Sequence, residues 1–278
     1  MIAAPDGRFV VTTDMMIEGP DFRLGWSTPH DLGWKAAASN LADVAAMGAL
    51  PTALVVALAA PSDSPVALLE GICDGLRDAC ATLAPGCGVV GGDLSVSPTL
   101  TIAITAFGDL EGRPPVVRSG ARPGDVLAVA GVLGESAAAL ALLFREAVGP
   151  NGDTEAALAD ALRPRTAAQL APRPPIASGA LAAIAGATAM LDLSDGLAID
   201  AGRMAAASGI RIEFDSALLG PDPDAALAGG EDHSLLAAFP PGVTLPADFR
   251  QIGVCVAGSG ISLDGNPVAA IGWDPYRG

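Results

Sequence analysis

The sequence has almost none of the residues on which several common phosphate and metal sites depend. Lysine occurs once, as Lys35, and histidine occurs twice, as His30 and His233. No Walker loop, G-x-G-x-x-G dinucleotide motif or H-E-x-x-H zinc motif occurs. Two histidines cannot form a three-histidine zinc site. The sequence therefore excludes the commonest nucleotide-binding loops, the H-E-x-x-H motif and three-histidine zinc centres.

Cysteine pairs and long apolar runs are also missing. The four cysteines, Cys73, Cys80, Cys87 and Cys255, include no C-x-x-C pair, which argues against zinc ribbons and redox motifs. The most apolar stretch, residues 53–60, is far shorter than the roughly 20 residues that cross a bilayer. Residues 1–14 do not resemble a signal peptide. We therefore expect free thiols, no membrane partner and a cytoplasmic location.

Positive charge is scarce, because 15 Lys and Arg stand against 31 Asp and Glu, a net charge of −16. Such a chain repels nucleic acid and anionic membrane, so no nucleic-acid partner is expected. A phosphorylated substrate would need neutralisation by something other than lysine and arginine, and metal held by carboxylates is the usual answer. With 51% apolar residues over 278 positions, the chain can form one large domain or two ordinary ones.

Hydrophobic periodicity and turn residues predict alternating strands and helices. One helix should begin at Thr28 as N-cap, with Pro29 at the first helical position and Asp31 three after the cap, and end at Gly48. Further helices are expected after Ser64, from about 135, over 180–185 and from 197 to about 208. Strands are expected over 8–13, 53–60, 89–90, 100–107, 126–130, 189–193, 210–214, 235–239 and 254–257. The Gly- and Pro-rich segment 108–123 is interpreted as an interdomain linker.

The residues with most chemical potential are acids at expected strand ends or in apolar surroundings. They are Asp14, Asp43, Asp93, Asp192 and Asp195. Each alone has a simpler interpretation, such as a strand end, an exposed helix position or an N-cap. Together, five acids without obvious partners favour a site for a hard cation such as Mg²⁺, which binds carboxylate oxygens. The hydroxyls of Thr12, Thr13 and Ser194 could complete its shell.

An ordered set of motifs over nearly the whole chain resembles the thiamine-monophosphate kinase family. The motifs are Val-Val-Thr-Thr-Asp14, Glu18-Gly19-x-x-Phe22, Lys35-Ala-x-x-x-Asn40-x-x-Asp43-x-Ala-Ala-Met-Gly48-Ala-x-Pro51, Gly91-Gly92-Asp93, Arg118-Ser119-Gly120-Ala121-x-Pro123-Gly124-Asp125, Asp192-x-Ser194-Asp195-Gly196-Leu197, Gly229-Gly230-Glu231-Asp232 and Gly272-Trp273-Asp274. Any one of them is a weak signal, whereas the ordered set is specific.

The resemblance implies an α+β fold of the two-domain aminoimidazole-ribonucleotide-synthetase-like type. Residues 1–112 would form an N-terminal domain for ATP and Mg²⁺ binding and dimerisation, and residues 113–278 a C-terminal α+β domain. The enzyme would transfer the γ-phosphate of ATP to thiamine monophosphate, giving thiamine diphosphate, with several Mg²⁺ ions as cofactors and a homodimer as the assembly.

The resemblance also implies roles for individual residues. The metal ligands would be Thr12, Thr13, Asp14, Asp43, Asp93, Asp192 and Asp195, of which Asp43, Asp93 and Asp195 are the candidate catalytic residues. Arg118 and Ser194 would contact ATP, and Glu231 and Trp273 would contact the thiamine end of the substrate. Asp21 stands where the family usually has a substrate-contacting histidine, so its contact is the least expected of the set.

Two alternatives stay open. The chain could be another ATP-dependent enzyme of the superfamily, related to the hydrogenase-maturation or selenophosphate enzymes, although it lacks their terminal cysteines. The family also carries a Gly-Asp-Asp-Ala-Ala segment before the first motif found here. Its absence predicts a missing N-terminal strand and metal ligand, and it leaves open a truncated homologue that binds nucleotide or partners without catalysis.

Overall fold

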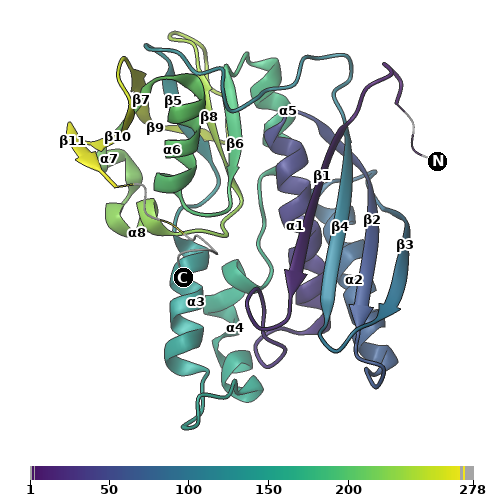
Figure 1. Cartoon of the computed structure of the whole chain (residues 1–278). Coiled ribbons are helices and arrows are strands. Elements are labelled where there is room, and N and C mark those ends of the chain that lie inside the picture. Colours follow the sequence, from purple (N-terminus) through teal and green to yellow (C-terminus); the bar gives the residue numbers. More distant parts are fainter. Residues whose placement is uncertain (1, 3, 270–271, 273–278) are drawn as a thin grey trace.

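The computed structural model describes residues 2, 4–269 and 272, and the strands within them form two sheets (Figure 1). The first sheet has the strand order β1-β4-β2-β3, and the second has the order β11-β10-β7-β9-β5-β8-β6. Helices pack on both sheets, which confirms the α+β class. No helix of the described residues is long and apolar enough to span a bilayer.

The first sheet and its two helices occupy the N-terminal part of the chain. Strand β1 is antiparallel to β4, β4 is antiparallel to β2, and β2 is parallel to β3. Figure 1 shows α1 and α2 on one face of this sheet and no helix on the other. The elements are β1 (Val10–Ile17), α1 (Pro29–Ala46), β2 (Leu50–Ala60), α2 (Val66–Leu83), β3 (Val89–Val96) and β4 (Thr101–Asp109).

The second sheet begins after a segment, residues 110–125, that contains neither helix nor strand. This segment overlaps the expected linker, while the domain division at residues 112 and 113 stays a prediction. The elements are β5 (Val126–Ala130), α3 (Glu135–Glu146), α4 (Ala156–Leu170), α5 (Ile176–Ile184), β6 (Ala189–Leu193), α6 (Leu197–Ser208), β7 (Arg211–Phe214), α7 (Ser216–Leu219), α8 (Pro223–Ala228), β8 (Ser234–Phe239), β9 (Phe249–Val256), β10 (Gly260–Leu263) and β11 (Asn266–Val268).

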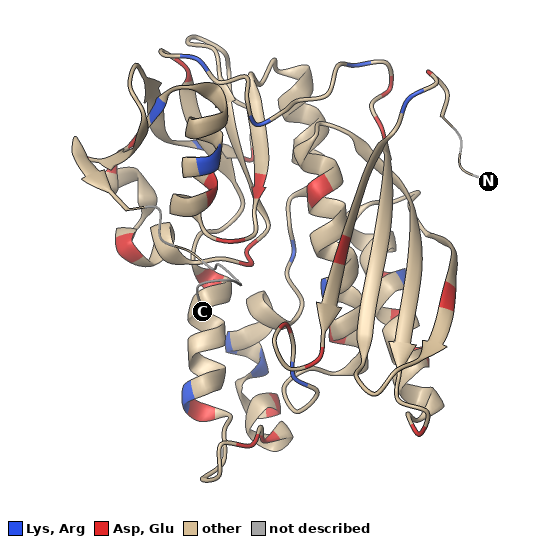
Figure 2. Ribbon diagram, viewed as in Figure 1, with Lys and Arg blue, Asp and Glu red and all other residues tan. Residues whose placement is uncertain are grey.

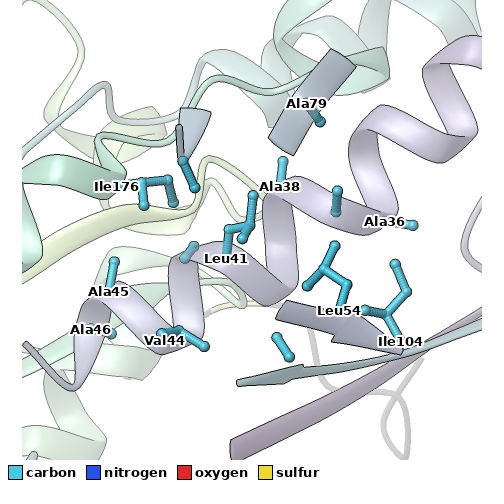
Figure 3. Packing of buried hydrophobic residues seen from close by; sticks show 14 of the residues in the cluster. Ala36, Ala38, Leu41, Val44, Ala45, Ala46, Leu54, Ala79, Ile104 and Ile176 are labelled. Carbon is cyan, nitrogen blue, oxygen red and sulfur yellow. The ribbon is translucent and has the colours of Figure 1, made fainter. Parts of the chain in front are cut away.

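Helix α1 is the central element of the core. Its capping box matches the sequence prediction, because the Thr28 hydroxyl accepts from the Asp31 N–H and the Asp31 carboxylate accepts from the Thr28 N–H. The helix is buried almost all round, and it contacts α2, α5 and strands of both sheets. Figure 3 shows its alanines and Leu41 packed against Ile176 of α5 and Leu54 and Ile104 of the first sheet.

Two glycines allow α1 and α2 to approach closely. A β-carbon on Gly33 would lie 2.0 Å from the Ile72 carbonyl oxygen, and one on Gly75 would lie 2.0 Å from the His30 carbonyl oxygen. Any larger residue would therefore push the two helices apart. This contact holds the helix that carries Asn40 and Asp43 firmly in place.

Several expected boundaries were wrong. Strand β1 does not end at Asp14 but continues to Ile17, and β3 does not end before Asp93 but continues to Val96. Both acids therefore lie inside strands, because β1 stays paired with β4 as far as Ile17 and β3 stays paired with β2 as far as Val96. Strand β9 begins at Phe249 rather than near Val254, and α7, α8, β10 and β11 were not anticipated.

Candidate active site

Four of the five acids from the sequence share one electrostatic environment between the two sheets. Asp14 comes from β1, Asp43 from α1, Asp192 from the end of β6 and Asp195 from the turn after it. Figure 2 shows acidic positions on β1, on α1 and near the end of β6, on the sides where the two sheets face one another. We call these four residues the acidic cluster.

Burial and mutual repulsion raise the pKa values of two members of the acidic cluster, Asp43 and Asp14. Burial, followed by the charges of Asp192 and Asp14, raises the pKa of Asp43 to about 7, although the Thr12 hydroxyl donates to Asp43 Oδ2 over 2.8 Å. Desolvation by surrounding protein, with the charges of Asp192 and Asp195, also raises the pKa of Asp14. The cluster thus gathers more negative charge than its own surroundings neutralise.

On the N-terminal side, α1 fixes the position of β1. Asn40 is 1% exposed, and its Oδ1 accepts the Asp14 backbone N–H over 3.2 Å. Its amide nitrogen donates to the Ala36 carbonyl, which fixes the amide orientation. Asp43 lies three residues further along the same helix face. An edge-strand N–H is thereby satisfied by a side chain, and Asp14 is held beside Asp43.

On the C-terminal side, Asp200 of α6 shapes the turn that carries Asp195. Its carboxylate accepts the N–H groups of Asp195 and Gly196 over 3.0 and 3.1 Å, and Arg203 bonds the carboxylates of both Asp195 and Asp200. Burial raises the pKa of Asp200 to about 6. Gly196 has φ +127°, a conformation that only glycine adopts without strain.

Asp93 and Thr13 lie on the opposite face of the first sheet. Asp93 is level with Ala57, Ala103 and Met15 across the strands, and Thr13 pairs with Thr105 on the same outward face. Asp93 is therefore three strand spacings, about 14 Å, from β1 and is separated from the acidic cluster by the sheet. Within this chain the seven expected metal ligands do not converge at one point.

A pocket of about 550 Å³ lies beside the acidic cluster. Its walls are largely apolar and aromatic, with a few polar groups, which is the usual make-up of a small-molecule site. The backbone N–H of Glu231, one of the lining residues, donates to the Ser194 carbonyl and links the pocket to the turn of the cluster. Other lining residues include Asp21, Phe22, Arg23, Trp26, Lys35, Leu140, Leu143, Phe144, Gln169 and Gly272.

The loop that carries Glu231 is held in a strained conformation. Glu231 and His233 have φ values of +61° and +51°. Between them, the Asp232 carboxylate accepts the N–H groups of Gly134 and Ser136 and so caps α3, whose own N-cap residue offers no side chain. His233 is buried and its Nδ1 lies 3.5 Å from Asp192 Oδ2, so this loop supports the pocket and the acidic cluster together.

The remaining predicted residues are spread more widely. Ser194 lies between Asp192 and Asp195, beside the acidic cluster. The Arg118 carbonyl accepts from Ser208 at the far end of α6, so Arg118 and Ser194 lie about 18 Å apart along this helix. Asp21 lines the pocket, and its carboxylate also accepts the Ile17 N–H. Trp273 lies outside the described residues.

The donor chemistry of the acidic cluster fits Mg²⁺. Carboxylate and hydroxyl oxygens are the ligands of hard cations, and a cation would relieve the repulsion that raises the pKa of Asp43. Among the described residues, no three carboxylate, imidazole or thiol groups already converge on a metal position. Such an arrangement suits an ion that takes only some of its ligands from protein and the rest from water and phosphate.

Several residues around the site escaped the sequence analysis. Gln169 and His233 contact predicted residues but carry no motif of their own. Trp26 and Phe144 form pocket walls, although their spacing resembles ordinary core packing. Asp200 did carry a signal, since it is an acid in an apolar helix like Asp43. Lys35 was recognised as the sole lysine, but its pairing with Glu231 at 3.1 Å was not foreseen.

Comparisons with known proteins agree on the family. The AIR synthase related protein N-terminal domain matches residues 1–110, and the corresponding C-terminal domain matches residues 122–247. The thiamine-monophosphate kinase of Mycobacterium tuberculosis strain H37Rv is 43% identical over an alignment 294 positions long, which covers 100% of this chain and 82% of that protein. The crystal structure of thiamine monophosphate kinase from Aquifex aeolicus is 34% identical, with a TM-score of 0.81 over 95% of this chain and 90% of that one.

A further solved structure, AaThiL complexed with AMPPCP and TMP, is 34% identical, with a TM-score of 0.81 over 95% of this chain and 86% of that one. The hydrogenase maturation protein HypE of E. coli is 20% identical, with a TM-score of 0.67 over 97% of this chain and 88% of that one, which shows a shared fold alone. The sequence relatives, the structural relatives and the ordered motifs together place this chain in the thiamine-monophosphate kinase family.

Proposed function

We propose that this protein transfers the γ-phosphoryl group of ATP to thiamine monophosphate, giving ADP and thiamine diphosphate. The observation that carries the proposal is an apolar pocket whose lining residue Glu231 is hydrogen-bonded to the turn of the acidic cluster, in which the pKa of Asp43 is raised to about 7. An acid cluster of this kind favours cations that accompany phosphates, and the pocket suits a heterocycle. The related AaThiL, solved with AMPPCP and TMP, supports the same pair of substrates.

The acidic cluster would position the phosphates through bound metal. Asp14, Asp43, Asp192 and Asp195 would hold Mg²⁺, which when bound neutralises the phosphate charges and stabilises those that develop during transfer. Asn40 and Thr12 orient the acids of the N-terminal sheet, and Asp200 and Arg203 orient the turn of the C-terminal part. Since phosphoryl transfer is mainly a matter of positioning, these supports are central to the chemistry.

The pocket would hold the thiamine end of the acceptor. Trp26 and Phe144 contact one another edge to face, with ring centroids 4.9 Å apart, and form an aromatic wall. Arg23 lies 4.7 Å from the centre of each ring and fixes that wall. Asp21 and Glu231 supply carboxylates, and we extend the proposal to Trp273 on the motif alone. An acceptor seated here would direct its phosphate toward the acidic cluster.

The nucleotide would lie along α6. Ser194 stands beside the acidic cluster, where the phosphates belong, and Arg118 lies near the other end of the helix. An extended ATP molecule can contact both residues only with its phosphates at Ser194 and its nucleoside toward Arg118. The division into domains at residues 112 and 113 then separates the β1 and α1 ligands from the α6 ligands.

We further propose a homodimer through the uncovered face of the first sheet. Its outward positions along the paired stretch of β1 and β4, from Val11 to Ile17 and from Thr101 to Phe107, carry no charge, and Val11 and Met15 are 53% and 57% exposed. These positions are Val11, Thr13, Met15, Ile17, Thr101, Ala103, Thr105 and Phe107. A second copy offers a matching surface that is uncharged over these two strands. Asp93 and Thr13 lie on this face, so we propose that they act at the interface. Four free cysteines accord with the proposed cytoplasmic location.

The activity is tested with purified protein, ATP, MgCl₂ and thiamine monophosphate, with thiamine diphosphate and ADP measured by chromatography. We expect equal amounts of both products. ATP turnover without thiamine diphosphate would favour another acceptor within the superfamily, and nucleotide binding without turnover would favour a non-catalytic homologue.

The assembly is tested by sedimentation of the wild type and a Met15→Lys variant. We expect a dimer that dissociates at least tenfold more readily when a buried charge is placed at the interface. Val66→Lys, at a 68% exposed position on α2, is the matched control and should leave the dimer intact. A monomeric wild type contradicts the proposed assembly.

A further inference from the structure

Lys35 is a buried cation in the wall of the pocket. Only 6% of the residue is exposed, and it projects from α1 as that helix's one contribution to the described lining of the pocket. Its Nζ lies 3.1 Å from Glu231 Oε1, so a residue of the N-terminal sheet's helix pairs with the loop before β8. A buried ammonium is costly unless it serves as an ion-pair partner or a hydrogen-bond donor to something.

Glu231 is oriented from a second side by a chain of hydrogen bonds. Gln169 Nε2 donates to Glu231 Oε2, and the Ser136 hydroxyl donates to Gln169 Oε1, which fixes the direction of the amide. Burial acts to raise the pKa of Glu231, but Lys35 and Gln169 outweigh it and hold the pKa below its ordinary value. Glu231 is therefore an ionised carboxylate that only accepts hydrogen bonds.

Both members of the pair keep capacity for a ligand. An ammonium has three N–H donors, and among the described residues the one acceptor in contact with Lys35 is Glu231 Oε1. Each carboxylate oxygen can accept two hydrogen bonds, and within the described part of the chain each oxygen of Glu231 has one partner. A donor and an acceptor thus stand side by side on one wall of the pocket.

We infer that Lys35 and Glu231 together recognise the aminopyrimidine edge of thiamine monophosphate, which makes Lys35 a specificity-determining residue. This edge presents a ring nitrogen that accepts and, next to it, an exocyclic amino group that donates. Lys35 donates to the ring nitrogen and Glu231 accepts from the amino group. The inference rests on the proposed function and assigns both a new residue and the part of the substrate that it binds.

The pyrimidine fits this pair better than the cationic thiazolium does. The pair carries no net charge, so it offers a cation little attraction, whereas its alternating polarity matches a neutral amino-heterocycle. Trp26 and Phe144 provide the aromatic surface on which a flat ring packs.

The test compares thiamine monophosphate with oxythiamine monophosphate, in which a carbonyl replaces the amino group and the adjacent ring nitrogen carries a hydrogen. This analogue reverses the donor and the acceptor. For the wild type we expect kcat/KM for thiamine diphosphate formation to exceed that for the oxythiamine product by about 100-fold or more, because mismatched buried polar groups stay unpaired.

The variants separate recognition from folding. Lys35→Met should reduce the preference to below about tenfold, mainly through a higher KM for thiamine monophosphate, and Lys35→Arg should restore part of it. Glu231→Gln should also lower the preference, since an amide can donate to the analogue's carbonyl. Phe144→Leu is the matched pocket control and should slow both substrates equally.

Binding of unphosphorylated thiamine and oxythiamine to the wild type, measured by calorimetry, keeps the test valid if Lys35→Met does not fold. Equal affinity for the two compounds overturns the inference, as does an unchanged preference in a folded Lys35→Met variant. A wild type that makes no thiamine diphosphate fails the proposed function instead, whichever compound it binds.

Discussion

The acidic cluster and the Lys35–Glu231 pair are two groups of partly buried carboxylates at the same boundary, and the protein treats them in opposite ways. In the cluster, burial and like charge raise the pKa values of Asp14 and Asp43. In the pocket, Lys35 and Gln169 hold the pKa of Glu231 low despite its burial. The unbalanced negative charge of the acidic cluster suits a cation that arrives with the substrates. The internally balanced Lys35–Glu231 pair suits the recognition of an uncharged ring.

Among these predictions, removing one acid from the acidic cluster should have the largest effect, which is a loss of activity. Asp43→Asn should lower kcat roughly a thousandfold, the scale expected when several kcal/mol of charge stabilisation are lost. The fold should persist, because the substitution removes repulsion rather than packing. Steady-state kinetics and circular dichroism measure both effects, with the exposed Asp63→Asn as control. Activity within threefold of the wild type would remove Asp43 from the site.

Breaking the balanced pair should instead destabilise the protein. Lys35→Met leaves Glu231 without its cation and should cost about 2 kcal/mol of unfolding free energy, less than for a fully buried pair because Glu231 is partly exposed. The double variant Lys35→Met with Glu231→Leu should recover much of that loss. Urea unfolding measures it, and a double variant less stable than Lys35→Met would show that the two residues are not coupled.

The unbalanced charge of the acidic cluster should appear in the pH dependence of the melting temperature. A carboxyl whose folded-state pKa is raised binds its proton more tightly in the folded protein, so its contribution to stability falls as pH rises from about 4 to about 7. In EDTA, the melting temperature should therefore fall by a few degrees more over this range in the wild type than in Asp43→Asn. Addition of MgCl₂ at pH 8 should raise the wild-type melting temperature. Parallel curves for the two proteins would contradict this account.

The smallest expected effect concerns the hydroxyl that partly offsets the repulsion. Thr12→Val removes the hydrogen bond to Asp43 Oδ2 with little change in shape. We expect the MgCl₂ concentration for half-maximal activity to rise about threefold, since one hydrogen bond to a charged group is lost. Thr52→Val, which loses a bond to the Phe107 carbonyl instead, is the control. An unchanged requirement for MgCl₂ would limit Thr12 to a structural role.

Local signals predicted much of the fold. The Thr28 cap, the helix end before Gly48 and the succession of strands along the chain from β1 to β9 follow from short-range chemistry, and each is present in the structure. The extent of β1 past Asp14 does not follow from such chemistry. An acid inside an edge strand is tolerated because Asn40, 26 residues away, accepts its N–H, and no local pattern shows that contact.

The candidate site was predictable as a set of residue types but not as an arrangement. The motifs selected Asp14, Asp43 and Asp192, which the structure brings close together, and also Asp93, which lies behind the sheet. Because strand residues alternate between faces, the side of each acid depends on the register with β4 and β2. The pairing of Lys35 with Glu231 depends on contacts between parts of the chain nearly 200 positions apart.

Side chains of strand β1 point alternately to the two faces of the sheet. Thr12 and Asp14 point toward the acidic cluster, and Thr13 and Met15 point toward the outer face. Inserting or deleting a single residue in its first half would exchange these roles, sending a thioether to the phosphates and a carboxylate to the opposite surface. Substitutions within this strand should therefore be tolerated far better than changes in its length. Related proteins should differ in the residue types of this strand but keep the same number of residues in it.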